Sequence, residues 1–132
     1  MAKVINTKID DGIFIFTFTN NEDEVFSSFK LNPTDINVAA RAEELTEYFE
    51  QFEDSIRKVT SGKEIAELNK QIEDKINYLL GYEASKDLFK EPITATTVFG
   101  NGQVFVYIVL DKIAEAIAPE IEKRKKKMQT AV

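Results

Sequence analysis

Carboxylates are the side chains best able to do chemistry in this sequence, and they crowd into one short stretch. The stretch contains Glu43, Glu44, Glu47, Glu50, Glu53 and Asp54. Paired carboxylates can perform general acid–base catalysis or bind a hard cation when they converge in a pocket or differ in environment. A solvated helix face meets neither condition. We therefore expect a plain surface or a docking face for a basic partner here, in preference to a metal or catalytic site.

Other chemically active residues are missing. The sequence has no Cys and no His. The lack of Cys excludes disulfides, thiolate nucleophiles and sulfur-ligated metals, and the lack of His removes the commonest general base and transition-metal ligand. The glycines at 100 and 102 lack the spacing and the following Lys of a phosphate-binding loop, so they indicate a turn. We expect no enzyme activity and no cofactor.

The charge distribution also narrows the class of partner. The net charge is −6, and removing the five basic residues at 123–127 leaves −11 for the rest of the chain. An acidic body argues against a nucleic-acid platform, because phosphate contacts need a basic face. The N-terminus lacks the apolar run of a signal peptide, and the longest apolar run, 104–110, is far shorter than a bilayer span. We expect a cytoplasmic protein with no nucleic-acid or membrane partner.

The first secondary-structure element that the sequence predicts is a β-hairpin. Residues 13–19 alternate so that Phe14, Phe16 and Phe18 share one face of a strand. Residues 25–31 form the second strand after a polar loop at 20–24. A two-stranded sheet is marginal in water, so we expect this hairpin to pack on helices or to extend another sheet.

A long helical hairpin follows. The segment 32–35 is a helix-start signal, with Asn32 as the expected cap and Pro33 in the first helical position. A heptad seam then runs along the helix through Val38, Ala42, Leu45, Phe49, Phe52, Ile56 and Val59. Ser61 and Glu64 form a capping-box pattern that starts a second, antiparallel helix, which we expect to end at Gly81.

The last third of the chain contains a segment whose pattern fits two different structures. Residues 82–90 offer one or two helical turns, and residues 93–110 fit either a second β-hairpin or a loop followed by a helix from about Asn101. We favour the helix because its apolar spacing continues unbroken through Val106, Leu110, Ile113, Ile117 and Ile121. Pro119 should kink or restart that helix.

Together these elements predict an α+β fold that is mainly α. We expect one domain over 1–132, with the β-hairpin at 1–31 and the helical hairpin at 32–81. A short helix, a loop and a C-terminal helix should occupy 82–122, and a basic tail 123–132. The basic tail suits a solvated helix end that complements the helix dipole.

The sequence has more aromatic residues than its predicted elements can bury within one chain. This excess is the main argument from the residues that the protein assembles with itself or with a partner. A two-stranded hairpin and two long helices cannot all hide their apolar stripes internally, so some of these residues should face a partner. The candidate partner-binding residues are Glu43, Glu47, Glu50 and Asp54 of the acidic face, Phe49 and Phe52 of the seam, and Phe14 and Phe16 of the hairpin. The seam could instead be consumed by the second helix.

The order of these parts has a counterpart in a known family. A phenylalanine-rich strand pair leads through Lys30-Leu31-Asn32-Pro33 into the helical hairpin, and a last helix precedes a Lys-rich tail. Three further segments contribute: Ile76-Asn77-Tyr78-Leu79-Leu80-Gly81-Tyr82-Glu83-Ala84, Ser85-Lys86-Asp87-Leu88-Phe89 and Ile113-Ala114-Glu115-Ala116-Ile117. The chain resembles the tail assembly chaperones of phages of Gram-positive bacteria over nearly its whole length, by pattern and without a diagnostic chemical motif.

The resemblance implies a non-catalytic protein of the bacterial host cytoplasm that oligomerises. It would coat the tape-measure protein and keep its long apolar helices soluble until tail-tube subunits replace the chaperone. Such families often also exist in a frameshifted longer form. The resemblance supplies no catalytic residues.

Three other functions compete with this one. A small acidic inhibitor of the immunity or anti-defence type would mask a basic site as a monomer in a tight complex. A structural virion subunit would remain in the finished particle. An enzyme of unknown type would need a deep pocket with convergent carboxylates of perturbed pKa.

Overall fold

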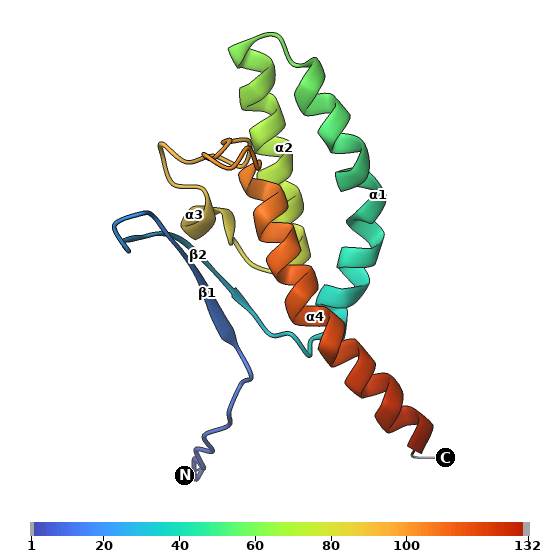
Figure 1. Cartoon of the computed structure of the whole chain (residues 1–132). Helices are drawn as coiled ribbons and strands as arrows, with labels where there is room; N and C mark the ends of the chain where they lie inside the picture. Colours follow the sequence, from blue (N-terminus) through green and yellow to red (C-terminus); the bar gives the residue numbers. More distant parts are fainter. Residues whose placement is uncertain (1, 131–132) are drawn as a thin grey trace.

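The alternating and heptad patterns produce the elements expected of them. The computed structural model describes residues 2–130, with side chains except at 124, 125 and 127–130. Within that range the fold is α+β and 54% helical, with one β-hairpin followed by four helices. The elements are β1 (Phe14–Thr19), β2 (Val25–Leu31), α1 (Ile36–Lys58), α2 (Gly62–Leu80), α3 (Ser85–Leu88) and α4 (Phe105–Thr130). Figure 1 shows α4 lying between the β-hairpin and α1.

The β-hairpin has the predicted strands and loop. β1 pairs antiparallel with β2, with Phe16 opposite Phe29 and a register shift at Phe18 and Thr19. In the loop, the Asn20 side-chain oxygen accepts hydrogen bonds from the backbone N–H groups of Glu22 and Glu24, at 2.9 and 3.1 Å. Phe16 stacks on Phe29 with ring centroids 4.7 Å apart, so this face of the hairpin packs into the core.

The start of α1 differs from the prediction. Asp35, not Asn32, caps the helix, because its carboxylate accepts the backbone N–H of Asn37 at 2.9 Å. Asn32 instead holds the turn that precedes the helix, where its side-chain oxygen accepts from the N–H of Thr34 at 3.0 Å. Two Asx side chains three residues apart compete for the cap, and the later one takes it.

The connection between α1 and α2 follows the predicted capping pattern. Ser61 accepts the backbone N–H of Glu64 at 3.2 Å, and the Glu64 carboxylate accepts the N–H of Thr60 at 3.4 Å. The two helices run antiparallel (Figure 1). α2 ends at Gly81, whose φ of 80° gives the left-handed C-cap.

Residues 93–110 form a loop followed by a helix. The alternative β-hairpin does not form, and this segment has one isolated antiparallel bridge, between Val98 and Val104. α4 begins at Phe105, four residues later than expected, and it continues through Pro119 as one helix, so a restarted helix is wrong. The predicted basic tail falls on its last turns. Residues 131–132, and the side chains at 124–125 and 127–130, lie outside the described residues.

An aromatic cluster joins α4 to the rest of the fold. Phe105 is 1% exposed. Its ring lies 5.3 Å from those of Phe18 and Phe99, 5.8 Å from that of Phe89 and 5.9 Å from that of Phe26. These contacts tie the first turn of α4 to both strands and to the segment after α3. They fix where α4 enters the fold.

Candidate functional site

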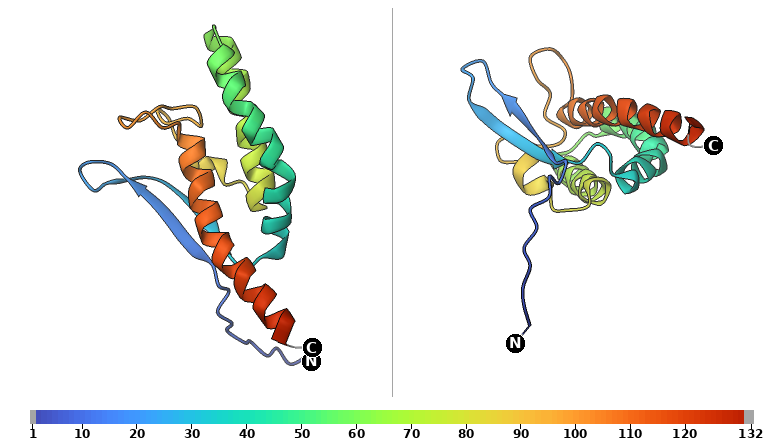
Figure 2. Two further views of the ribbon diagram at one scale, coloured as in Figure 1. Left: turned by 45° about the vertical axis from the view of Figure 1, so that its right-hand side comes forward. Right: turned by 90° about the horizontal axis from the view of Figure 1, so that it is seen from below.

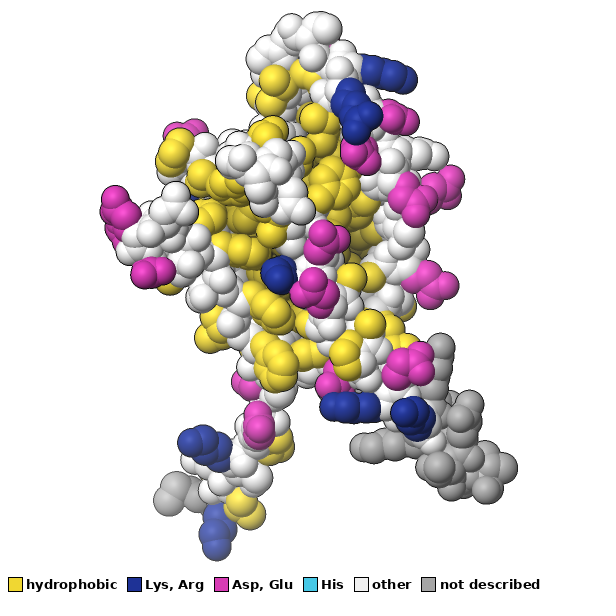
Figure 3. Space-filling model, in the orientation of Figure 1, with side chains coloured by type: hydrophobic (Ala, Val, Ile, Leu, Met, Phe, Trp, Pro, Cys, Tyr) yellow, Lys and Arg dark blue, Asp and Glu magenta, His cyan; other side chains and the backbone are white. Residues whose placement is uncertain are grey.

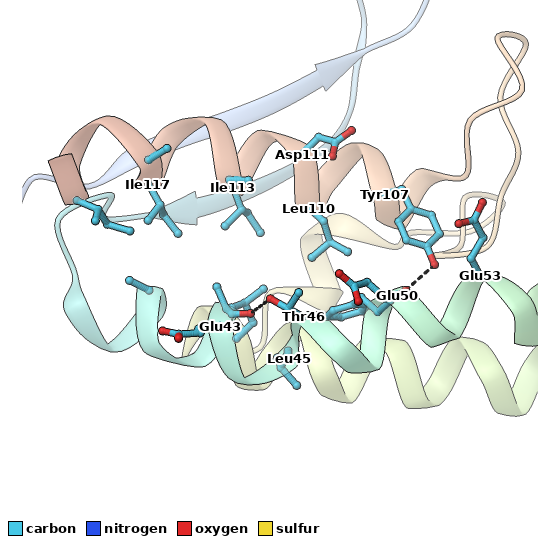
Figure 4. A pocket seen from close by; sticks show the side chains of 17 residues that line it. Glu43, Leu45, Thr46, Glu50, Glu53, Tyr107, Leu110, Asp111, Ile113 and Ile117 are labelled. Carbon is cyan, nitrogen blue, oxygen red and sulfur yellow. Dashed lines mark hydrogen bonds between the residues drawn. The ribbon is translucent and has the colours of Figure 1, made fainter.

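A hollow lined mainly by apolar side chains lies between α1 and α4. We call it the α1/α4 groove and define it by its lining residues: Ala39, Ala42, Glu43, Leu45, Thr46, Phe49, Glu50, Glu53, Leu79, Tyr107, Leu110, Asp111, Ile113, Ala114, Ile117, Ala118 and Ile121. Its volume is about 660 Å³. Figure 4 shows Leu110, Ile113 and Ile117 of α4 pointing toward α1 across it.

Small side chains line the groove on both of its walls. Ala39 and Ala42 of α1 stand where larger residues would close the space, and Ala114 and Ala118 do the same on α4. The one hydroxyl in the lining outside the tyrosine, that of Thr46, donates to the carbonyl oxygen of Ala42 at 2.9 Å. The walls are therefore apolar, with the polar groups confined to the edges.

The rim of the groove is acidic. It carries Glu43, Glu50 and Glu53 from α1 and Asp111 from α4, all exposed. Glu53 pairs with Arg57 at 3.1 Å. Glu43, Glu50 and Asp111 have no ion-pair partner among the residues that the structure describes. Figure 3 shows acidic side chains beside the hydrophobic ones along the α1 edge. An apolar partner with basic flanks would complement this rim.

Tyr107 closes one end of the groove. Its hydroxyl donates to the backbone carbonyl oxygen of Phe49 at 3.0 Å, a bond drawn in Figure 4. Burial, followed by the nearby charges of Glu53 and Asp54, raises the pKa of Tyr107 to about 12. The phenol therefore stays protonated at physiological pH and serves as a donor, not as a base.

The structure brings together only part of the predicted set. Glu43, Phe49 and Glu50 line the groove, with Phe49 buried at 7% exposure and the two carboxylates exposed. Glu47 and Asp54 are exposed on α1 outside the lining.

The predicted phenylalanines outside the groove behave differently from one another. Phe52 is 3% exposed and belongs to the core. This burial agrees with the alternative in which the seam packs inside the fold and does not face a partner. Phe16 packs on the core as a half-buried residue, and Phe14 is 55% exposed on the β-hairpin. None of these three lines the groove.

The α4 wall is the part that sequence reasoning missed. The apolar stripe of Leu110, Ile113, Ile117 and Ile121 served only to predict a helix, and neither this stripe nor Ala114 was among the predicted partner-binding residues. The available signal was the width of the stripe, since Ala114 and Ala118 extend it beyond what one neighbouring helix covers.

Chemistry at this site is limited by its residue types. The residues that the structure describes contain no group of three or more His, Cys, Asp or Glu side chains placed to hold a metal ion. No helix in the described range combines the length and the apolar character that crossing a membrane requires.

No protein-family model, curated protein or solved structure matches this chain. Along α1 the groove runs from Ala39 to Glu53, a span of about 21 Å at 1.5 Å per residue. It can take the apolar face of a helix of about four turns, or about six residues of extended chain.

Proposed function

We propose that this protein is a non-catalytic tail assembly chaperone of a phage of Gram-positive bacteria. It self-associates in the cytoplasm of the bacterial host and binds the tape-measure protein, holding its apolar helices in solution until tail-tube subunits replace it. The observation that supports the proposal is the α1/α4 groove, whose apolar walls and acidic rim suit an amphipathic client helix with basic flanks. The resemblance of the sequence names the client.

The geometry also suits release of the client. A groove of about 660 Å³ accepts one face of a helix and leaves the other exposed. Each contact is then weak, and a long client gains affinity by engaging many copies. A tail-tube subunit that competes for the client can then displace the bound copies of this protein one at a time.

The acidic face of α1 favours a second candidate, a small acidic protein inhibitor. Glu47 and Asp54 lie outside the groove and remain exposed, so they could meet a basic partner without using the groove. This candidate predicts a one-to-one complex whose association slows with salt and does not depend on Ala114.

Binding of a tape-measure fragment to matched variants tests the first candidate. Ala114→Arg fills the groove from α4, whereas Ala66→Arg adds the same side chain to an exposed position of α2. Fluorescence anisotropy with a labelled fragment should show at least tenfold weaker binding for A114R and less than twofold change for A66R. Equal binding by the two variants would contradict the groove, and a strictly monomeric protein that ignores the fragment would contradict the function.

A further inference from the structure

The segment before β1 carries the most exposed large hydrophobic side chains that the structure describes. Residues 2–13, here called the N-terminal arm, form no helix or strand. Val4 and Ile5 are each 80% exposed, and Ile9 is 77% exposed. Lys3 and Lys8 stand beside them. The arm therefore presents an apolar segment flanked by two positive charges, with nothing in its own fold to cover it.

The root of the arm is attached to the body of the protein. The side-chain amide of Asn32 donates to the carbonyl oxygen of Asp11 at 3.2 Å. The carboxylates of Asp10 and Asp11 accept the backbone N–H groups of Gly12 and Ile13, both at 3.0 Å. The two acidic residues of the arm are thus engaged at its root, which leaves the basic part, residues 3–9, projecting beyond them.

The arm also leaves the fold in a direction that separates it from its own groove. The right-hand view of Figure 2 shows it extending from the hairpin on the side opposite α4. α4 forms one wall of the groove, so the arm of the same chain points away from the site that would complement it.

We propose that the N-terminal arm of a second copy of this chain occupies the α1/α4 groove. Val4, Ile5 and Ile9 would lie against the apolar walls, and Lys3 and Lys8 would meet the acidic rim at Glu43 and Glu50. The lengths agree, because residues 3–9 span about 20 Å when extended and the groove spans about 21 Å along α1. Charge agrees as well, since both rim carboxylates lack an ion-pair partner among the described residues.

Each copy offers one arm and one groove. Two copies can exchange arms in a closed dimer, and more copies can pass arms in one direction around a ring. The arm and an amphipathic client would compete for the same walls. The proposal shares the groove with the proposed function but does not need the identity of the client, and its test uses only this protein.

Self-association of the full chain gives the first test. Val4→Asp with Ile9→Asp should raise the dissociation constant at least tenfold in sedimentation equilibrium, while Val98→Asp, at a position 61% exposed in the loop before α4, should change it less than twofold. Circular dichroism, and the thermal midpoint at concentrations where both proteins are monomeric, should match the wild type, because the arm contributes nothing to the core. Wild-type association by the arm variant, or a wild-type chain that stays monomeric at every concentration, would overturn the proposal.

A charge exchange tests whether the contact joins two chains. Lys3→Glu/Lys8→Glu gives an acidic arm, and Glu43→Lys/Glu50→Lys gives a basic rim. Each variant alone should associate at least fivefold more weakly than the wild type, and an equimolar mixture should recover association, since the acidic arm of one fits the basic rim of the other. A mixture no tighter than its components would overturn the proposal. So would a crosslink between arm and groove that forms within single chains of monomeric protein.

Discussion

The hydroxyl of Tyr107, in the first turn of α4, donates a hydrogen bond of 3.0 Å to the backbone carbonyl oxygen of Phe49 in the middle of α1. The two residues lie 58 positions apart in the chain. Their contact crosses one end of the α1/α4 groove and holds the two walls at a fixed distance there.

Loss of this contact should weaken the fold moderately. Tyr107→Phe keeps the ring and removes the hydroxyl, so we expect a loss of about 0.5–1.5 kcal/mol in the free energy of unfolding. Urea denaturation should show a lower midpoint with an unchanged slope. Tyr78→Phe is the matched control, because its hydroxyl donates to the exposed Glu44 side chain at 2.6 Å. An equal loss in both variants would contradict a special role for Tyr107.

Alkaline pH should destabilise the protein through the same phenol. The pKa of Tyr107 in the folded protein is about 12, above the ordinary tyrosine value of 10.0. Between these values the unfolded chain releases the proton while the folded chain retains it, so stability is complete below pH 10 and falls as the pH rises toward 12. Denaturant unfolding at several pH values should show a shallower fall for Tyr107→Phe. Identical pH profiles for the variant and the wild type would contradict the assignment.

Removal of one buried hydroxyl should be costly. Ser27 is 2% exposed, and its hydroxyl donates to the carbonyl oxygen of Leu88 at 2.8 Å. Ser27→Ala leaves that carbonyl without this partner between β2 and α3, so we expect a loss of about 1–2 kcal/mol. Ser28→Ala, at the next and less buried position of β2, should change stability by less than about 0.5 kcal/mol. Thermal unfolding followed by circular dichroism measures both. A neutral S27A would show that the hydroxyl is dispensable.

Two glycines should respond to alanine in opposite directions. Gly81 has a φ of 80°, and a Cβ added there would lie 3.1 Å from a guanidinium nitrogen of Arg41. Gly81→Ala should therefore cost about 1 kcal/mol or more. Gly62 opens α2 with open space around it, so Gly62→Ala should stabilise by about 0.4–1 kcal/mol. Thermal midpoints that shift in the same direction would contradict the distinction.

The elements of this fold could be predicted because their signals are local. Alternation gave both strands of the hairpin, and Ser61, Glu64 and Gly81 marked the helix ends that the structure confirms. The failures occurred where two local signals compete. Asn32 and Asp35 can both cap a helix, and the residues before Phe105 fit a turn, a strand or a helix start. Contacts of Phe105 with both strands decide the latter case.

The candidate site was only partly predictable, because local patterns do not show which elements meet in the fold. Glu43, Phe49 and Glu50 were identified on α1, but their counterparts on α4 were not, because a helical pattern shows that a face is apolar without showing which element covers it. Phe49 and Phe52 illustrate the ambiguity, since both lie on the seam and in the buried core, but only Phe49 also lines the groove.

The sequence by itself determined most of the secondary structure, the absence of Cys and His, and the acidic surface of α1. Those properties follow from residue type and short-range spacing. Only the tertiary structure decided that α4 stands apart from α1 along a groove, and that the N-terminal arm leaves the fold on the opposite side. The groove depends on the aromatic contacts of Phe105 and the hydrogen bond of Tyr107, and the arm is attached through the hydrogen bond from Asn32 to Asp11. These contacts join residues remote in the chain and leave no periodic pattern in the sequence.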